Sequence, residues 1–323
     1  MTKNQNVFFV GKGIPILGKK IIEKCGEKES RIIYVDFSDG EYIPQLEKSV
    51  RGKNVFMIQS TNATETSTAD NLFNILIFAD AAKRASAKKV VAVIPYFGFA
   101  RQERKDKPRT PITAKLVAKL LEASGIDRII TMDLHAEAIQ GFFETPVDNL
   151  YASYMFVPAL EKIITPNTII ASPDSGGLKR ATKYATYFGT EVVICYKQRA
   201  KGPNEVEKVI VIGDPSGKDV IVFEDIIDTG NTLAKVGDAL MKKGAKSVTV
   251  FSSHGVLSGK AYENLKNSCI QKIYITDSHP KALVYKEEHP DIDVEIISSA
   301  DLFAKAIQEV IIDGSVNELF IFQ

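Results

Sequence analysis

Short apolar runs alternate with longer amphipathic segments along the whole chain. Each run is four or five residues long, which suits a buried strand better than a helix. The runs predict strands at Val7–Val10, Arg31–Val35, Val55–Gln59, Val90–Ile94, Arg128–Met132, Thr168–Ala171, Glu191–Cys195, Val220–Phe223, Ser247–Phe251, Lys272–Ile275 and Val294–Ile297. Helices are predicted between them, for example at Thr68–Ala85 and at Pro111–Ser124, where Pro111 opens the segment and Gly125 follows it.

Alternation of strand and helix predicts an α/β fold with mainly parallel sheets flanked by helices. The strands are too many for one small doubly wound sheet, so we expect two domains of similar architecture. Pro146, Pro158 and Pro166 interrupt the pattern near the middle of the chain. We therefore place the domains at 1–150 and 151–323, with a final helix and strand over 298–323 that close the second domain or pack across the boundary.

Composition excludes several classes of protein. The 323 residues include 41 Lys and Arg against 40 Asp and Glu, and this net charge of +1 gives no global attraction to nucleic acid or to a membrane surface. The longest apolar stretch, near Leu72–Ala82, is too short and too polar to span a membrane. Three widely spaced cysteines, Cys25, Cys195 and Cys269, together with a polar start to the chain, predict a protein of the cytoplasm.

The segment Val220–Thr232 carries the strongest chemical signal. A predicted strand runs into Glu224 and Asp225, and the loop that follows, from Asp228, reads Asp-Thr-Gly-Asn-Thr before a helix. Backbone N–H groups of Thr229, Gly230, Asn231 and Thr232, helped by the helix dipole, would bind a phosphate, and the carboxylates before them would bind sugar hydroxyls or a metal. The alternative is a capped turn preceded by two solvated carboxylates.

In open parallel sheets, ligands bind beyond the carboxyl ends of the strands. Acids, bases and glycines follow the predicted strands in both halves of the chain. These segments are Asp36–Glu41, Pro95–Phe97 with the basic loop after it, Asp133–His135, Ser172–Gly177 and Lys197–Arg199. Their positions predict a site that is shared between the domains or across a subunit contact.

The loop Phe97–Pro111 contains five cations, Arg101, Arg104, Lys105, Lys107 and Arg109, against only two acids. Guanidinium groups fork onto phosphate oxygens, so this loop is suited to a triphosphate. The aromatic residues near its start, Tyr96, Phe97 and Phe99, suggest a face for a purine. A solvated surface loop is the alternative reading.

Several of these segments together resemble one enzyme family. Val220–Thr232 resembles the ribose-5-phosphate loop shared by phosphoribosyltransferases and ribose-phosphate pyrophosphokinases (PRPP synthetases). The segments that resemble the pyrophosphokinases are Phe37–Glu41, Arg101–Arg104, Met132–Ala136, Ser172–Arg180 and Lys197–Arg199. They occur in the family's order over nearly the whole chain, so the sequence is identified as a member of that family. Three positions depart from its usual pattern: Glu103 and Glu224, where Asp is usual, and Asn231, where Ala or Gly is usual.

The resemblance implies two phosphoribosyltransferase-like domains, the first on the ATP side and the second binding ribose 5-phosphate. It implies attack by the 1-hydroxyl of ribose 5-phosphate on the β-phosphorus of Mg-ATP, which gives PRPP and AMP. The site residues that it implies are Phe37, Asp39, Glu41, Arg101, Gln102 and His135 for ATP; Glu224, Asp225, Asp228, Thr229, Gly230, Asn231 and Thr232 for ribose 5-phosphate; His135 and Asp174 for Mg²⁺; and Lys197 and Arg199 for catalysis. The family's common class forms hexamers that phosphate activates and ADP inhibits, so a homo-oligomer with a regulatory site is expected.

Two other functions remain open at this point. A phosphoribosyltransferase would share Val220–Thr232 but would consume PRPP, and it would need neither the basic loop nor a second nucleotide-binding half. A regulatory homologue of the synthetase would keep the fold and bind nucleotides without turnover. Lys197 and Arg199 are both present, which favours an active enzyme.

Overall fold

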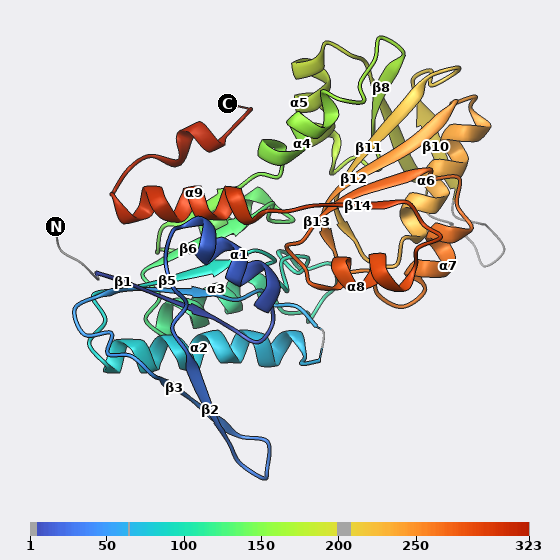
Figure 1. The fold of residues 1–323 in the computed structure, drawn as a ribbon. Helices are drawn as coiled ribbons and strands as arrows, with labels where there is room; N and C mark the ends of the chain where they lie inside the picture. The colour runs from blue at the N-terminus through green and yellow to red at the C-terminus, as the bar shows by residue number, and fades with distance from the viewer. Residues whose placement is uncertain (1–4, 64, 199–207, 323) are drawn as a thin grey trace. The chain divides into compact units, whose positions relative to one another are not determined.

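The computed structural model describes residues 5–63, 65–198 and 208–322 (Figure 1). Contacts divide the chain into two units, each described here by itself. Unit 1 comprises Met1–Ala152, Ser278–Pro280 and Ser298–Ile321, and unit 2 comprises Ser153–Asp277, Lys281–Ile297 and Phe322–Gln323. Of the two expectations for the segment 298–323, the assignment to unit 1 agrees with packing across the boundary and not with closing the second domain, and no final strand is present in the described residues. The helix α9 (Ala300–Ile311) and the 3₁₀ turn η2 (Val316–Leu319) belong to unit 1.

Unit 1 is built on a five-stranded sheet in which all paired strands are parallel, in the order β1-β4-β5-β6-β7. The strands are β1 (Asn6–Val10), β4 (Asn54–Ile58), β5 (Lys89–Ile94), β6 (Arg128–Met132) and β7 (Val147–Leu150). Its other helices are α1 (Pro15–Lys24), α2 (Thr68–Arg84), α3 (Thr113–Ala123) and the 3₁₀ helix η1 (Glu137–Phe142). Central strands such as β4 and β5 are almost continuously apolar because both faces of the sheet are covered.

Unit 2 contains a seven-stranded sheet in the order β10-β9-β8-β11-β12-β13-β14, in which only β10 is antiparallel to its neighbour. The strands are β8 (Thr168–Ser172), β9 (Val192–Gln198), β10 (Lys208–Ile212), β11 (Asp219–Ile227), β12 (Ser247–Gly255), β13 (Lys272–Thr276) and β14 (Val294–Ile297). The helices are α4 (Ser153–Leu160), α5 (Leu178–Phe188), α6 (Asn231–Lys242), α7 (Ala261–Lys266) and α8 (Lys281–Glu288).

The two units repeat one topology. The order β1-β4-β5-β6-β7 corresponds strand for strand to β8-β11-β12-β13-β14. In the sequence of each unit, an antiparallel pair of strands comes between the first and second members of this order. The α/β fold of two similar domains is thus confirmed. The units differ in that pair, because β9 and β10 extend the sheet of unit 2 whereas β2 (Ile32–Asp36) and β3 (Tyr42–Leu46) form a separate two-stranded sheet beside α2.

Three strands that the apolar runs did not predict are present: β3, β7 and β10. Pro44 in β3, and Asp148 and Asn149 in β7, weaken the apolar signal of those strands, whereas β10 contains the apolar run Val209–Ile212, which was missed. Strand β11 also continues beyond the predicted end at Phe223. Glu224 and Ile226 pair with Ser252 and His254 of β12, so the carboxylates lie within the strand and not after it.

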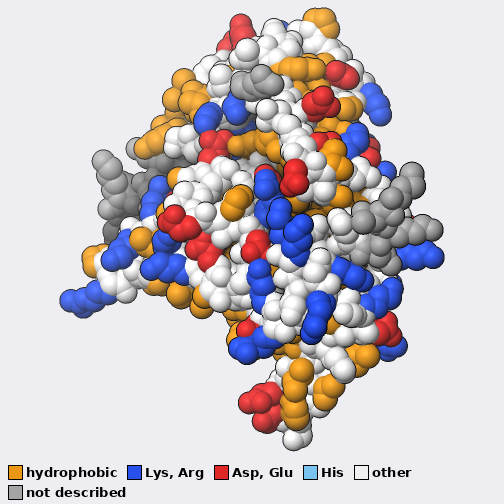
Figure 2. Space-filling view, turned by 90° about the vertical axis from the view of Figure 1, so that its left-hand side faces the viewer, with side chains coloured by type: hydrophobic (Ala, Val, Ile, Leu, Met, Phe, Trp, Pro, Cys, Tyr) orange, Lys and Arg blue, Asp and Glu red, His pale blue; other side chains and the backbone are white. Residues whose placement is uncertain are grey.

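Charges of both signs are present at the surface, as the near-equal numbers of basic and acidic residues lead one to expect. Figure 2 shows Lys and Arg side chains scattered among Asp and Glu on the face that it draws. Within the described ranges, no helix has the length and apolar content needed to cross a bilayer.

Candidate active site

The loop between β11 and α6 forms an open helix N-terminus in unit 2. Gly230 is the N-cap residue, with a left-handed backbone (φ 71°), and Ala234 N–H donates to its carbonyl over 2.9 Å. As a glycine, this N-cap residue makes no side-chain capping hydrogen bond. The first turn of a helix leaves N–H groups without intrahelical acceptors, and the helix dipole adds positive potential there. The loop is therefore suited to an anion.

The segment after β12 holds this loop from one side. The N–H groups of Leu257 and Ser258 donate to the carbonyls of Ile227 and Asp228, each over 3.0 Å. The Ser258 hydroxyl also donates to the Asp228 carboxylate through a short hydrogen bond. Sequence reasoning missed Ser258, because it lies 30 residues away along the chain.

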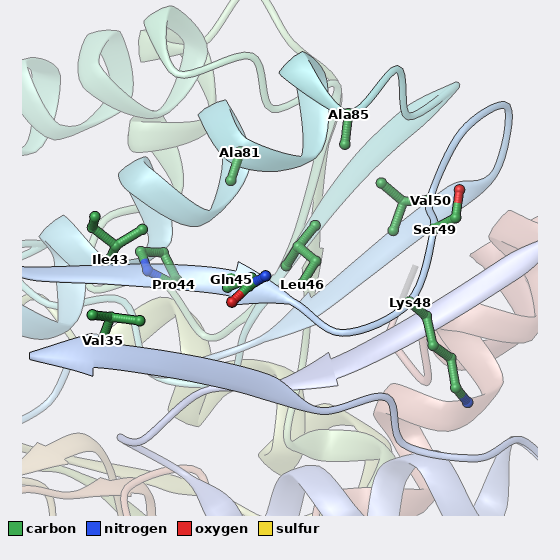
Figure 3. Close-up of a pocket in the computed structure, with 10 residues that line it drawn as sticks. All are labelled: Val35, Ile43, Pro44, Gln45, Leu46, Lys48, Ser49, Val50, Ala81 and Ala85. Carbon is green, nitrogen blue, oxygen red and sulfur yellow. The ribbon is translucent and has the colours of Figure 1, made fainter.

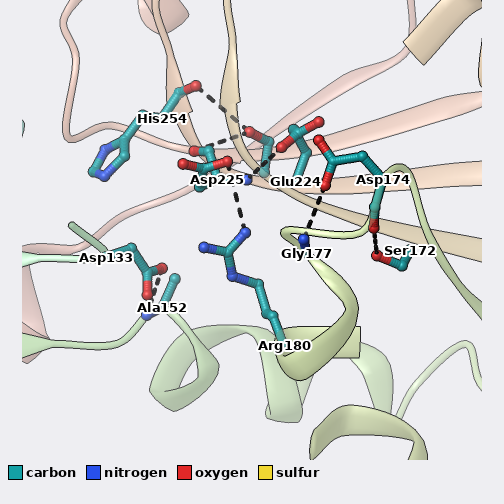
Figure 4. A network of polar contacts seen from close by, with 10 residues as sticks. Asp133, Ala152, Ser172, Asp174, Gly177, Arg180, Glu224, Asp225 and His254 are labelled. Carbon is teal, nitrogen blue, oxygen red and sulfur yellow. Dashed lines mark hydrogen bonds and ion pairs between the residues drawn. The ribbon is translucent and has the colours of Figure 1, made fainter. Parts of the chain in front are cut away.

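Three carboxylates, Asp174, Glu224 and Asp225, gather near the Arg180 guanidinium (Figure 4). Glu224 Oε1 accepts from the N–H of Asp225 over 3.1 Å, and Arg180 Nη1 lies 3.8 Å from Asp225 Oδ1. Burial raises the pKa of Glu224 well above its ordinary value, and the negative charges of Asp225 and Asp174 add to this, while Arg180 partly opposes them. The cluster thus has an excess of negative charge that a cation would offset.

Asp174 is fixed at the start of α5. Its Oδ1 accepts from Gly177 N–H over 2.9 Å, and its carbonyl accepts from the Ser172 hydroxyl over 2.6 Å. The structure therefore brings Asp174 and the β11 carboxylates into one electrostatic cluster, as the sequence predicts. Arg180 was not among the predicted residues, although it lies two residues into the helix that Ser172–Gly177 opens.

In unit 1, the loop after β5 is anchored rather than exposed. Tyr96 and Phe97 are 7% and 4% exposed, so the expectation that these aromatic rings present a face to a purine is wrong. Phe97 packs edge-on against Phe143, with ring centroids 6.1 Å apart. Phe97 belongs to the hydrophobic core of unit 1, and Tyr96 packs edge-on against His279 with ring centroids 5.2 Å apart, so both rings hold the start of the basic loop in place.

Hydrogen bonds fix the same loop to the end of β4. Ser60 Oγ accepts from Tyr96 N–H over 3.0 Å, and Thr61 Oγ1 accepts from Gly98 N–H over 2.6 Å. Arg101 and Gln102 follow and are exposed. Thr113 donates its hydroxyl proton to Gln102 Oε1 over 2.6 Å, which orients that amide.

His135 lies just beyond the carboxyl end of β6 and is exposed. The backbone ahead of it is unusual, because Asp133 has a positive φ of 42° and Leu134 N–H donates to Asn149 Oδ1 over 3.1 Å. Asn149 of β7 thereby shapes the turn that presents His135. Since β7 was not predicted, this contact could not have been predicted either.

Phe37, Asp39 and Glu41 lie in the β2–β3 turn, which projects away from the five-stranded sheet (Figure 1). They were expected at the site because they follow a predicted strand of the parallel sheet. This reason was wrong, because β2 is not a strand of that sheet. Glu41 N–H donates to Asp39 Oδ1 over 3.1 Å, and Phe37 is 48% exposed. A pocket of about 520 Å³ lies between the hairpin and α2, lined by residues from Val35 to Ala85, and it contains none of the predicted site residues (Figure 3).

The structure describes little of the two predicted catalytic residues, Lys197 and Arg199. The Lys197 backbone pairs with Val209 near the end of β9, and its side chain falls outside the description. Arg199 lies outside the described residues.

Comparison with known proteins decides between the families that the geometry allows. The model of the N-terminal domain of ribose phosphate pyrophosphokinase matches residues 6–125, and the phosphoribosyl transferase domain model matches residues 156–278. The ribose-phosphate pyrophosphokinase of Campylobacter jejuni is 50% identical over 285 residues, which cover 88% of this chain and 89% of that protein. The chain belongs to the ribose-phosphate pyrophosphokinase family.

Other members of the family agree over nearly the full length. The ribose-phosphate pyrophosphokinase of Porphyromonas gingivalis is 44% identical over 322 residues, 99% of each chain. The crystal structure of phosphoribosylpyrophosphate synthetase from Mycobacterium smegmatis has a TM-score of 0.88 at 33% identity and covers 96% of this chain and 100% of that one. A phosphoribosyltransferase alone would not account for the match to residues 6–125.

The three departures from the usual ribose-phosphate pyrophosphokinase pattern have different structural settings. Glu224 folds back to accept from its neighbour's N–H, so its longer side chain is held against its own strand. Asn231 is the first residue of α6 and is exposed. Glu103 is partly buried and lies 3.6 Å from Arg104 Nε.

The residues present fit a magnesium ion held mainly by substrate. Over residues 5–63, 65–198 and 208–322, no group of three or more His, Cys, Asp or Glu forms a protein cage for a metal. Mg²⁺ usually keeps several waters and binds through one or two carboxylates plus substrate phosphates. The setting of Glu224 suits this, because burial and then the negative charges of Asp225 and Asp174 raise its pKa, and a divalent cation would offset those charges.

Proposed function

We propose that this chain is a ribose-phosphate diphosphokinase that transfers the β,γ-diphosphoryl group of Mg-ATP to the 1-hydroxyl of ribose 5-phosphate. The O1–Pβ bond forms while the bond from Pβ to the oxygen of AMP breaks, and the hydroxyl proton is released. One observation carries the proposal: in a chain of this family, a helix with a glycine N-cap follows the strand that carries Glu224 and Asp225, two members of a three-carboxylate cluster. That arrangement suits a sugar phosphate, with amides for the phosphate and carboxylates for the hydroxyls.

The loop Thr229–Thr232 binds the 5-phosphate through its N–H groups. Glu224, Asp225 and Asp228 face the ribose hydroxyls or the metal associated with them. Because the pKa of Glu224 is raised, this carboxyl group holds a proton more tightly than an ordinary glutamate does, and a nearby cation would stabilise its ionised form. Arg180 offsets part of the charge when the carboxylates are ionised.

Arg101 and Gln102 bind the ATP phosphates, and His135 contributes both to ATP and to the metal. The anchored loop after β5 lowers the conformational cost of presenting Arg101, because Tyr96 and Gly98 are already tied to β4. Phe37, Asp39 and Glu41 are proposed for the adenine end of ATP, by family resemblance. Their exposure on a projecting turn leaves them accessible to a ligand.

His135 and Asp174 would hold Mg²⁺ together with substrate phosphates. When bound, the ion neutralises charge on the β- and γ-phosphates. Asp174 is prepared for this role because the Gly177 N–H holds its carboxylate in one orientation. Lys197 and Arg199 stabilise charge that develops on the transferred group, a role that contributes roughly a thousandfold or more in comparable phosphoryl transfers.

We further propose, by family resemblance, a homo-oligomer, with a hexamer as the expected form, and a regulatory site for phosphate or ADP. A cytoplasmic location accords with this metabolic role. Neither nucleic acid nor a membrane is expected as a partner.

AMP release from ATP, measured with and without ribose 5-phosphate, tests the function. A synthetase releases AMP only when the sugar phosphate is present, whereas a phosphoribosyltransferase or a regulatory homologue releases none. Lys197→Ala should lower kcat by roughly a thousandfold while the protein unfolds at the same temperature. Full activity in this variant would exclude the role given to the lysine.

A further inference from the structure

Asn264 of α7 reaches the loop at the start of α6. Its Nδ2 donates to the carbonyl of Thr229 over 2.8 Å, and the two residues are 35 positions apart. The neighbouring residue Leu265 packs against the same loop, because a Cβ added to Gly230 would lie only 2.9 Å from Leu265 Cγ. Helix α7 therefore contacts the loop through two successive side chains.

Three successive carbonyls of the loop are bound from this one side. Ile227 and Asp228 accept from the N–H groups of Leu257 and Ser258, each over 3.0 Å, and Thr229 accepts from Asn264. In a regular strand, successive carbonyls point in opposite directions. Here the segment 257–264 turns three in a row toward itself.

The direction of a carbonyl fixes the direction of the next amide. In a planar trans peptide, the C=O and the N–H point to opposite sides. The N–H groups of Asp228, Thr229 and Gly230 therefore point away from the segment 257–264. Successive amides that converge in this way form a concave anion site.

We infer that Asn264 is a positioning residue for the sugar-phosphate site, because it orients the Thr229–Gly230 peptide so that the Gly230 N–H faces the anion. The inference rests on the proposed function and adds to it a residue outside the loop that tunes affinity for the phosphate. Ser258 and Leu257 orient the two preceding peptides through backbone donors, which truncation of their side chains leaves in place. Asn264 is the member of the set that acts through its side chain.

The test compares Asn264→Leu, which removes the donor at similar volume, with Asn264→Gln, which keeps an amide donor. Asn267→Leu is the matched control, since Asn267 is an exposed residue at the C-terminal end of the same helix. Kinetics give KM for ribose 5-phosphate, KM for ATP and kcat, and calorimetry gives ribose 5-phosphate binding directly.

Asn264→Leu should raise KM and Kd for ribose 5-phosphate roughly fivefold, the effect of one hydrogen bond, with kcat and KM for ATP unchanged. Asn264→Gln should recover part of the affinity, and Asn267→Leu should match the parent. Unchanged ribose 5-phosphate binding in Asn264→Leu would overturn the inference while leaving the enzyme function intact. A parent protein that binds ribose 5-phosphate but releases no AMP would refute the proposed function alone, and one that does not bind it at all would refute both.

Discussion

Helices α2 and α6 occupy equivalent places in the two units, each following the second strand of the shared order, yet they begin in opposite ways. At α2, Ser67 Oγ accepts from Asp70 N–H and the Asp70 carboxylate accepts from Ser67 N–H, which is a complete capping box. At α6, the N-cap is a left-handed glycine, which makes no side-chain capping hydrogen bond.

The capping box uses the same physical attraction that a bound phosphate would use. Hydrogen bonds from Ser67 lower the pKa of Asp70, so this carboxylate is ionised at neutral pH and places its own negative charge at the N-terminus of α2. An anion arriving there would meet like charge. One topology therefore yields a closed helix start in unit 1 and an open one in unit 2, and the fold alone does not decide which unit binds a sugar phosphate.

Replacing Gly230 should have the largest effect, because it removes the open helix start that distinguishes unit 2 from unit 1. Gly230→Val places a branched side chain at φ 71° and against Leu265, so the open loop would be distorted. We expect kcat/KM for ribose 5-phosphate to fall roughly a hundredfold, which corresponds to about 2.8 kcal/mol because each tenfold change is worth about 1.4 kcal/mol.

Gly217→Val is the control for backbone strain. Gly217 has φ 68°, and no atom lies within 4 Å of an added Cβ. It should lose stability by about 1–2 kcal/mol without changing the kinetics. Equal kinetic losses in both variants would show that the Gly230 effect is general instability.

A second change tests whether unit 1 binds the ATP phosphates with the loop after β5, since the start of α2 is closed by its own cap. Gly98→Ala would put a Cβ 2.4 Å from the Thr61 carbonyl oxygen, so the anchored loop must shift. The expected result is a rise of about tenfold in KM for ATP, with KM for ribose 5-phosphate unchanged. Gly141→Ala, which adds a Cβ in open space, serves as the control in the same assay.

Removing the cap of α2 should have a smaller effect, confined to stability. Ser67→Ala should cost about 1 kcal/mol of unfolding free energy and lower Tm by about 2–4 °C, since a hydroxyl cap is lost. Both KM values should stay at the parent level. A changed KM for ribose 5-phosphate would mean that α2 takes part in binding this substrate.

The smallest expected effect is a pH-dependent gain in stability from Glu224→Gln. Because the pKa of Glu224 is raised in the folded protein, folding disfavours its ionised form, and stability declines as pH rises above the ordinary value of 4.5. The variant should match the parent below that pH and exceed its Tm by about 1–2 °C at neutral pH in metal-free buffer. Thermal unfolding over a pH series measures this difference, and a variant less stable than the parent at neutral pH would contradict it.

The apolar runs were enough to predict the central strands, because these are buried on both faces and carry an unbroken signal. They failed at β3 and β7, where proline or polar residues weaken the pattern, and the apolar run Val209–Ile212 of β10 was missed. The loop Asp228–Thr232 was predictable because its residues are consecutive. Its supports, Ser258 and Asn264, were not, because they meet the loop only through the fold.

The basic loop after β5 shows a second limit of prediction from the sequence, which concerns the exposure of its aromatic residues. Its charge was visible in the sequence, but Tyr96 and Phe97 were expected to be exposed because they lead into this charged loop. In the structure they are buried, and the charged residues begin only after them. Periodicity cannot separate a buried anchor from an exposed aromatic face over so short a stretch.

A crystal structure of the protein with ribose 5-phosphate tests the central claim most directly. The 5-phosphate oxygens should lie within hydrogen-bonding distance, about 2.7–3.2 Å, of the backbone nitrogens of residues 229–232, while the start of α2 keeps its Ser67–Asp70 capping box. A phosphate found at the N-terminus of α2, or a sugar phosphate bound with the loop before α6 vacant, would contradict the account.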